Sequence, residues 1–218
     1  MQKLNSNTVI KNLIEEKKLL RRLQKKAELE KIPIINITAG RFLEMICLSI
    51  QPKSILEIGC GTGFSSYFLI KNLKGGSYTG IDLNRERIRE AKKFIVNEFA
   101  EKKIRFLAGN ALNIIPGLKG KFDLVFIDAA KYEYPLYLKA VGNKLKPGAM
   151  IIADNIFYGG KIFKKEISQH DLKSVKGIKE YIDHISNSKS FSSYFIDIGD
   201  GISITEFSKK KLQYHDKK

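Results

Sequence analysis

The sequence predicts an α/β fold built on a mostly parallel sheet, and three observations lead to this prediction. Strand-like apolar runs alternate with helix-like segments over residues 54–153, which is typical of parallel strands connected by helices. Four of these runs end at an aspartate or a glycine-rich turn, as expected where strand ends border a binding crevice. Two later β-rich runs are separated by three residues, which indicates an antiparallel hairpin. We therefore expect helices on both faces of a parallel sheet that ends in an antiparallel pair.

The N-terminal part of the chain is predicted to be a helical extension over residues 7–50. Apolar side chains recur close to helical spacing between residues 7 and 31, and this segment ends before Pro33. One amphipathic helix or a helix pair is expected there. A second helical segment is expected at 39–50.

Alternating strands and helices follow this extension. Strands are expected where short apolar runs are bounded by glycine or polar residues, and helices where the apolar spacing is helical. No internal repeat interrupts the pattern, so a single domain over residues 1–218 is predicted. The expected elements are strand 54–58, helix 64–73, strand 77–82, helix 85–100, strand 104–108, strand 122–127, helix 132–145 and strand 149–153.

The last third of the chain departs from the alternation. The long segment 156–190 contains an expected helix at 175–185, and its first part could cover the crevice. Strands are expected at 192–198 and 202–207 on either side of the turn 199–201. The lysine-rich tail that follows is expected to fray.

Composition and charge limit the possible functions. The chain has 218 residues of which 43% are hydrophobic, and no apolar run suits a membrane span or a signal peptide. A cytoplasmic protein with no membrane partner is expected. Cys47 and Cys60 fit neither a disulfide framework nor a zinc pair, so both are expected to be reduced. The formal net charge of +16 favours a polyanion such as nucleic acid, although a solvated lysine-rich surface is the alternative.

A glycine-rich turn follows the first predicted strand. Gly59, Gly61 and Gly63 let the backbone approach a ligand closely and open the next helix, whose free N–H groups favour an anion. A dinucleotide site would have Gly or Ala at the position of Phe64, which makes NAD a poor match.

Polar residues around this turn suit a smaller ligand of mixed charge. Glu57 precedes the turn and Ser65 follows it, while Asp82 ends the next strand, where a carboxylate can accept both hydroxyls of a ribose. S-adenosylmethionine carries an ammonium, a sulfonium, a carboxylate and a ribose, which these groups can serve. A purely structural turn is the alternative interpretation.

A second group of polar residues consists of Asp128, Asp154 and Asn155, which follow or end two later strands. All three offer oxygen, the ligand atom of Mg²⁺, Mn²⁺ or Ca²⁺ and a poor match to zinc. Two acids at adjacent strand ends repel each other unless a cation lies between them. Lys131 could lie over the same crevice and act as a base. The alternative is that one acid caps a helix, the other forms a salt bridge, and Lys131 is an ordinary surface lysine.

Together, residues 57–65, 122–131 and 153–155 resemble the cation-dependent O-methyltransferases related to catechol and caffeoyl-CoA O-methyltransferases. The resemblance runs from about residue 32 to residue 207 and implies a Rossmann-like class I methyltransferase fold. It implies that Lys131 and Asp128 are catalytic, with Lys131 as the base, and that Mg²⁺ is bound by Asp128, Asp154 and Asn155. The contacts to S-adenosyl-L-methionine that it implies are Ile35, Glu57, Gly59, Gly61, Ser65, Asp82, Asn110, Ala111 and Asp128.

Within this group, residues 31–35, 154–160 and 199–201 are most similar to the bacterial tRNA 5-hydroxyuridine methyltransferases. The resemblance implies formation of 5-methoxyuridine at the wobble position, the tRNA anticodon loop as partner, and a homodimer. Ala130 and Asn110 stand where many relatives have an acid, which affects substrate and cofactor details more than the reaction. Candidate RNA contacts are Arg21, Arg22, Lys25, Lys26, Lys161, Lys164, Lys165 and Lys173.

Two other functions stay open at this point. A small-molecule O-methyltransferase for catechols or acyl-CoA phenols would use the same site with a narrower apolar mouth. A non-catalytic RNA-binding protein on a methyltransferase fold would have no use for the combination of Asp128, Lys131, Asp154 and Asn155.

Overall fold

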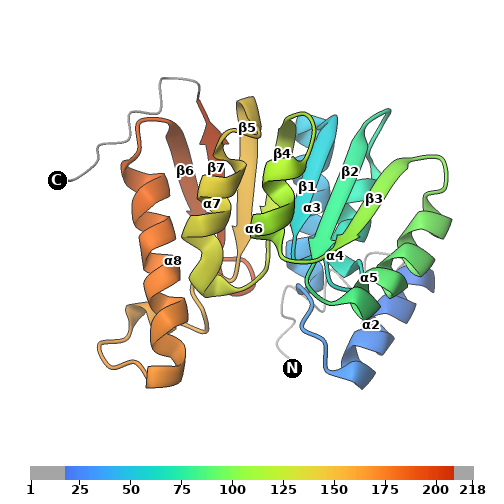
Figure 1. Cartoon of the computed structure of the whole chain (residues 1–218). Coiled ribbons are helices and arrows are strands. Elements are labelled where there is room, and N and C mark those ends of the chain that lie inside the picture. The colour runs from blue at the N-terminus through green and yellow to red at the C-terminus, as the bar shows by residue number, and fades with distance from the viewer. Residues whose placement is uncertain (1–17, 209–218) are drawn as a thin grey trace, which may run out of the picture. The chain divides into compact units, whose positions relative to one another are not determined.

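The computed structural model describes residues 18–208, which divide between Ala111 and Leu112 into two compact units (Figure 1). The strand order is β3-β2-β1 in the first unit and β4-β5-β7-β6 in the second. All pairs among β1, β2 and β3 are parallel, as is β4 with β5, whereas β7 is antiparallel to β5 and to β6. The predicted mostly parallel sheet with an antiparallel C-terminal pair is therefore confirmed. The expectation of a single domain stays a prediction.

The first unit contains the helical segments that precede the glycine-rich turn and the three strands that follow them. Its elements are α2 (Lys18–Glu30), α3 (Ile37–Ile50), β1 (Ser54–Ile58), α4 (Phe64–Lys71), β2 (Ser77–Asp82), α5 (Arg85–Ala91), the π-helical turn η1 (Lys92–Val96) and β3 (Lys103–Ala108). The part of the expected N-terminal helix before residue 18 lies outside the described residues.

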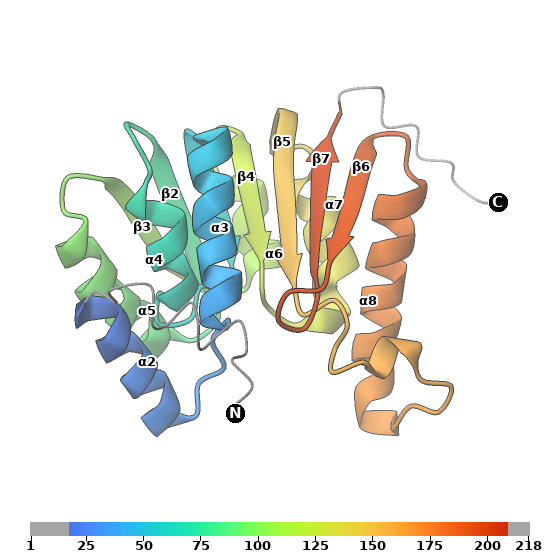
Figure 2. The same ribbon diagram turned by 180° about the vertical axis from the view of Figure 1, so that it is seen from behind.

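Close packing of α3 on α4 organises one face of this unit, where both helices lie in front of its strands in Figure 2. The Asn36 side chain caps α3 by accepting from Ala39 N at 2.7 Å, which satisfies one free N–H group of the first turn. Gly40 faces the ring of Phe68, and a Cβ at Gly40 would lie 2.4 Å from that ring. The absence of a side chain at Gly40 therefore lets the two helices approach.

Strand register places the ends of the three strands side by side. Ile58 of β1 pairs with Ile81 of β2, and Asp82 pairs with Ala108 of β3. The residues that follow β1 and β3 therefore lie on either side of Asp82. This arrangement is the one expected where neighbouring parallel strands form a ligand site at their carboxyl ends.

The second unit contains the remaining strands and two longer helices, of which α7 lies in front of the strands in Figure 1. The short helix α6 (Ala111–Ile114) spans the boundary between the units. The other elements are η2 (Ile115–Gly117), β4 (Phe122–Ile127), η3 (Lys131–Glu133), α7 (Tyr134–Gly142), β5 (Leu145–Asp154), η4 (Lys161–Phe163), α8 (Gln169–Asn187), β6 (Phe191–Ile196) and β7 (Ile202–Phe207).

Pairing in the second unit collects polar residues at one end of its strands. Ile127 of β4 pairs with Ala153 of β5, and Asp154 pairs with Ile202 of β7. Because Asp128 follows Ile127 directly, the two acids and the turn before β7 lie at adjacent strand ends. The sequence prediction that Asp128 and Asp154 emerge side by side is consistent with this register.

Several element boundaries differ from the predictions, and three of these differences have a clear structural reason. The expected helix 85–100 is interrupted by a wider π-helical turn at Lys92–Val96. Strand β5 begins at Leu145 rather than residue 149, because Leu145 pairs with Phe122 although a Pro-Gly sequence typical of turns follows it. Helix α8 begins at Gln169 rather than residue 175, since Ser168 caps a polar first turn that shows little apolar periodicity.

None of the helices in the described range combines the length and apolar character that a bilayer span requires.

Candidate active site

The glycine-rich turn of the first unit is fastened to the end of β2. The N–H groups of Gly59 and Cys60 both donate to the Ile81 carbonyl oxygen, at 2.8 and 3.1 Å. The Gly61 N–H donates to Asp82 Oδ2 at 2.9 Å. Gly59 and Gly61 have φ angles of 90° and 51°, which glycine adopts with less strain than other residues. The turn thus fixes the Asp82 carboxylate and uses its own N–H groups internally.

Two features of this turn leave room for a ligand. No heavy atom lies within 4 Å of the place that a Cβ of Gly61 would take. The hydroxyl oxygen of Thr62 is buried and has no hydrogen-bond partner among residues 18–208. Asp82 is 9% exposed, and its second carboxylate oxygen accepts from Asn84 N at 2.8 Å. Each Asp82 oxygen therefore keeps a lone pair for a further donor.

Glu57 lies at the centre of a buried hydroxyl cluster next to the turn. Its carboxylate accepts hydrogen bonds from Ser65, Ser66 and Tyr78, with Ser66 Oγ at 2.7 Å from Glu57 Oε2. Burial raises the pKa of Tyr78 well above its usual range, and the Glu57 charge adds to this. Tyr78 therefore stays a donor to the carboxylate. Ser66 and Tyr78 were not predicted from the sequence, although a tyrosine in a buried strand signals that its hydroxyl needs a partner.

The remaining residues predicted to contact the cofactor lie nearby or along the chain of the same unit. The Gly109 N–H donates to the Asp82 carbonyl oxygen at 2.9 Å, so exposed Asn110 follows directly beside the end of β2. Ala111 is 7% exposed at the start of α6, and Ile35 is 5% exposed before α3. The first unit therefore brings the glycine turn, Asp82 and Asn110 together, and the cofactor role of each stays a prediction.

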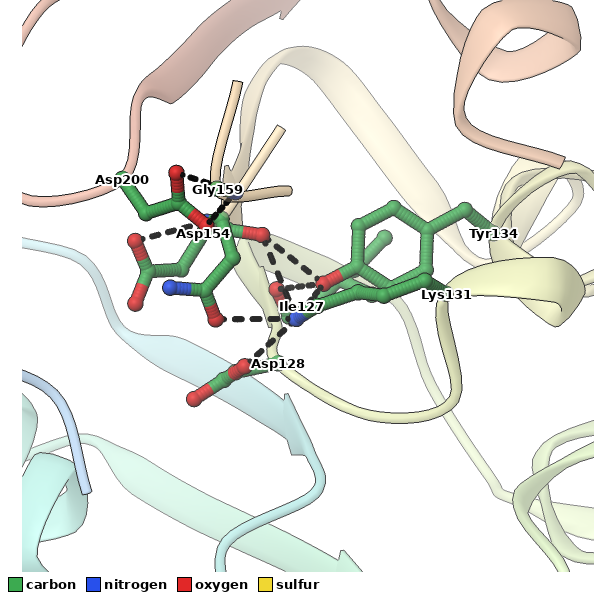
Figure 3. A network of polar contacts seen from close by, with 8 residues as sticks. Ile127, Asp128, Lys131, Tyr134, Asp154, Gly159 and Asp200 are labelled. Carbon is green, nitrogen blue, oxygen red and sulfur yellow. Dashed lines mark hydrogen bonds and ion pairs between the residues drawn. The ribbon is translucent and has the colours of Figure 1, made fainter. Parts of the chain in front are cut away.

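Lys131 lies at the centre of a polar network in the second unit (Figure 3). Its ammonium donates to Asp128 Oδ1 at 2.8 Å, to Asn155 Oδ1 at 3.0 Å and to the Tyr134 hydroxyl at 2.6 Å. Two oxygens predicted to bind a metal ion are thus within 3.0 Å of one nitrogen. Asp128 and Asn155 therefore converge on one point, which a positive charge already occupies.

Tyr134 links this network to the backbone of β5, a role that was not predicted from the sequence. The ring is fully buried, and the hydroxyl donates to the Asp154 carbonyl oxygen at 2.9 Å while it accepts from Lys131. Burial raises the pKa of Tyr134 well above its usual range, and the charges of Asp128 and Asp154 add to the rise. Tyr134 therefore remains neutral and orients the lysine.

Asp154 is a buried acid whose surroundings disfavour the ionised form of its side chain. It is 3% exposed, and burial raises its pKa to about 7, with the Asp128 charge as the second cause. The Asn155 N–H donates to Asp154 Oδ1 at 2.8 Å and lowers the pKa in part. Asn155 has a φ angle of 55°, so the backbone turns sharply at this point and directs the amide side chain toward Lys131.

The turn before β7 holds the segment that follows β5. Both carboxylate oxygens of Asp200 accept from the Gly159 N–H at 2.8 Å (Figure 3). The Asp200 carbonyl oxygen also accepts from Phe157 N at 2.9 Å. The Asp200 charge also contributes to the raised pKa of Asp154. Asp200 was identified in the sequence only as part of a turn, because its partner lies 41 residues away.

The chemistry of this donor set fits a hard divalent cation. Asp128, Asp154 and Asn155 supply two carboxylates and an amide oxygen, and two acids that repel each other are relieved by a shared cation. Within residues 18–208, no three His, Cys, Asp or Glu side chains form a cluster ready for a metal ion. A cation would instead take over Asp128 and Asn155 from the Lys131 ammonium. The metal ion stays a prediction.

Comparisons of the sequence and of the fold with known proteins both find O-methyltransferases. A model of the O-methyltransferase family matches residues 10–208. A catechol O-methyltransferase of Niastella koreensis is 28% identical over 157 residues, covering 69% of this chain and 70% of that protein. A caffeoyl-CoA O-methyltransferase of Eucalyptus globulus is 29% identical over 178 residues, covering 76% and 71%. The crystal structure of an O-methyltransferase of Bacillus cereus in complex with SAH shares the fold, with a TM-score of 0.82, 22% identity and coverage of 90% and 93%.

Proposed function

The chain belongs to the O-methyltransferase family, and from this premise we propose that it transfers the methyl group of S-adenosylmethionine to a ring hydroxyl with the help of Mg²⁺. The acceptor that we propose is 5-hydroxyuridine at the wobble position of tRNA, which would become 5-methoxyuridine. The observation that carries the proposal is the contact of the Lys131 ammonium with Asp128, Asn155 and Tyr134. This network joins the proposed base to two of the oxygens that we propose as metal ligands.

The first unit supplies the groups for the methyl donor in this proposal. Asp82 would accept the ribose hydroxyls with the lone pairs that Gly61 and Asn84 leave unused. Gly61 would let the donor approach the backbone closely, since a Cβ is missing there. Ser65 would hold the methionine carboxylate after it releases Glu57. The SAH-bound relative from Bacillus cereus supports this type of donor.

The second unit supplies the metal ligands and the base. Mg²⁺ at Asp128, Asp154 and Asn155 would lower the pKa of the acceptor hydroxyl and fix its direction. The cation would take over Asp128 and Asn155 from Lys131, which would free the lysine nitrogen for the acceptor hydroxyl. Tyr134 would keep the amine in place.

Lys131 would first release its ammonium proton to the solvent, after which proton and methyl transfer need no further reactant. Neutral Lys131 takes the proton of the acceptor hydroxyl, a type of catalysis that contributes about 10²–10⁴-fold. The oxygen attacks the methyl carbon in line, the carbon–sulfur bond breaks, and S-adenosylhomocysteine leaves with the electron pair on sulfur. Holding oxygen and carbon about 3 Å apart would supply much of the acceleration.

Two acceptors meet these requirements, and different observations favour each. A hydroxyl beside a ring carbonyl, as in 5-hydroxyuridine, offers two neighbouring oxygens, and the net charge of +16 favours a polyanionic substrate. A catechol ring, free or carried by an acyl-CoA, offers two neighbouring hydroxyls, and the relatives from Niastella koreensis and Eucalyptus globulus make it the second candidate. We propose the tRNA acceptor and treat the catechol as the competing result.

The test offers three acceptors to the full-length protein with labelled S-adenosylmethionine and Mg²⁺: tRNA with 5-hydroxyuridine, the same tRNA with uridine, and a catechol panel. We expect label in the first tRNA alone, with loss of transfer in a chelator and recovery on addition of Mg²⁺. Transfer to catechols but not to tRNA would overturn the proposed acceptor. Transfer that the chelator leaves unchanged would overturn the metal role, and no transfer to any acceptor would favour a non-catalytic RNA-binding protein.

A further inference from the structure

An exposed basic face of the second unit begins at the residue that follows Lys131. It consists of Lys164, Lys165 and Lys173 with the rings of Tyr132 and Phe163, and we call it the lysine face. We propose that the lysine face binds the RNA around the acceptor nucleotide, the lysines contacting phosphates and the rings contacting bases. This inference rests on the proposed tRNA substrate and names the surface that would recognise it.

The three lysines of this face differ from other candidate RNA contacts in their ion pairing. Within residues 18–208, neither Lys164, Lys165 nor Lys173 forms an ion pair. Other candidate RNA contacts differ, since Lys26 pairs with Glu30 at 2.6 Å and Lys161 pairs with Asp171 at 2.8 Å. The three lysines therefore remain available for phosphate groups, whereas Lys26 and Lys161 already serve the fold.

Two aromatic rings accompany these lysines at the surface. Phe163 is 70% exposed, although its ring centroid lies 5.4 Å from that of Phe157. Tyr132 is 40% exposed, and Lys173 Nζ lies 3.8 Å from its ring centroid. Exposed rings beside lysines that form no ion pair are a combination that suits single-stranded nucleic acid, because bases stack on rings while lysines follow the backbone.

Hydrogen bonds and close packing join the lysine face to the network of polar contacts around Lys131. Lys161 connects η4 to the first turn of α8 through Asp171, and a Cβ at Gly177 of α8 would lie 2.6 Å from Tyr132 Cα. Helix α8 therefore contacts both η4, which ends at Phe163, and η3, which carries Lys131. A nucleotide bound at Tyr132 would lie directly beside the proposed base.

A small neutral acceptor would need none of these features. A catechol carries no phosphate that could meet the three lysines. An anticodon loop carries a phosphate at each nucleotide and exposes unpaired bases. The lysine face consequently fits an RNA loop.

The test compares two triple variants of the full chain that remove the same charge. The variant K164Q/K165Q/K173Q changes the lysine face, and K119Q/K121Q/K139Q is its control. Lys119 and Lys121 are exposed and precede β4, so they lie at the opposite end of this strand from Asp128. The probe is a synthetic anticodon stem–loop with 5-hydroxyuridine, and its Kd is measured by fluorescence anisotropy over a range of salt concentrations. Calorimetric titration with S-adenosylmethionine checks that both variants remain folded.

We expect the face variant to bind the stem–loop about tenfold or more weakly, with a salt slope shallower by about two, since each phosphate contact contributes about 0.7 to that slope. The control should stay close to the wild type. A separate F163A variant should weaken binding roughly tenfold through lost stacking. Equal losses in both triple variants, or no loss in either, would overturn the lysine face. Wild-type protein that binds the stem–loop tightly but does not methylate it would instead overturn the proposed substrate.

Discussion

At the scale of single residues, the buried acid Asp154 shows how the fold disfavours a charge that a metal ion can compensate. Its pKa is raised to about 7 by burial and by Asp128. The folded protein therefore holds a proton on Asp154 more tightly than the unfolded chain does. Its stability should fall as pH rises between the ordinary aspartate range and about 7, and should stay lower above that.

This fall in stability with rising pH leads to the first prediction, which concerns the substitution Asp154→Asn. In a chelator at pH 8 the variant should melt a few degrees higher than the wild type. The reason is that a neutral amide replaces a carboxylate whose charge is disfavoured by burial and by Asp128. At pH 5 the difference should nearly disappear, since the wild-type side chain is protonated. Methyl transfer should be lost at both pH values while affinity for S-adenosylmethionine is kept. Thermal melting and calorimetry measure these effects. A variant less stable than the wild type at pH 8 would contradict the claim that the fold disfavours a charge on Asp154.

Tyr134 gives the second prediction at this scale. Tyr134→Phe removes the hydroxyl that accepts from Lys131 and donates to the Asp154 carbonyl, so kcat should fall about tenfold or more as the base loses its orientation. Tyr181→Phe is the matched control, because its ring centroid lies 5.6 Å from that of Tyr134 but its hydroxyl contacts Ser203. Steady-state kinetics with the same acceptor compare the two. Equal losses would mean that packing rather than the hydroxyl is responsible.

At the scale of secondary-structure elements, the contact between α8 and η3 determines where Lys131 lies. A Cβ at Gly177 would lie 2.9 Å from the Lys131 carbonyl oxygen, so Gly177→Ala must displace η3 or α8. We expect kcat to fall about tenfold or more with little change in S-adenosylmethionine affinity. Gly142→Ala is the control, because no atom lies within 4 Å of its Cβ position. Full activity of the first variant would show that η3 moves without consequence for the base.

The helix pair α3 and α4 allows a stability prediction with a pH signature. Glu44 joins them by accepting from Arg41 at 2.7 Å and Lys71 at 2.5 Å. Burial acts to raise the Glu44 pKa, but the bonds from Lys71 and Arg41 outweigh it and hold the pKa below its usual value. The stabilisation is therefore present at neutral pH and is lost as pH falls below the ordinary glutamate range.

We accordingly expect Glu44→Gln to lower the free energy of unfolding by about 1–3 kcal/mol at pH 7 and by much less near pH 3. Urea unfolding at the two pH values measures the change. Glu86→Gln is the control, because its ion pair with Arg89 lies on an exposed surface and contributes little. A loss at pH 3 as large as at pH 7 would exclude the charge as its cause.

Elements with a regular pattern were predictable from the sequence, and contacts between distant segments were not. Strands 54–58, 77–82, 122–127 and 202–207 were confirmed because each is a short apolar run with clear boundaries. Asp128, Asp154 and Asn155 could be predicted as candidate site residues because each one ends or follows a strand-like run. Tyr134 and Asp200 were not identified as partners, since their roles depend on backbone groups that only the tertiary structure brings near.

At the scale of the whole molecule, net charge separates the two candidate acceptors by the salt dependence of catalysis. The 39 Lys and Arg residues exceed the 23 Asp and Glu residues, so the chain should attract tRNA through counterion release. A catechol releases no counterions on binding. The kcat/KM for tRNA with 5-hydroxyuridine should therefore fall steeply with KCl, whereas that for a catechol should change little.

With three lysine contacts at about 0.7 each, the logarithm of kcat/KM for tRNA should fall by about two or more per tenfold rise in KCl. Initial rates at subsaturating acceptor give this slope directly, and Mg²⁺ is kept constant so that occupancy of the metal ligands does not vary. S-adenosylmethionine affinity measured in the same buffers serves as the control, because donor binding involves far fewer ionic contacts. If tRNA and catechol gave equal slopes, the excess of basic residues would have no part in recognition, and the lysines would act only as a solvated surface.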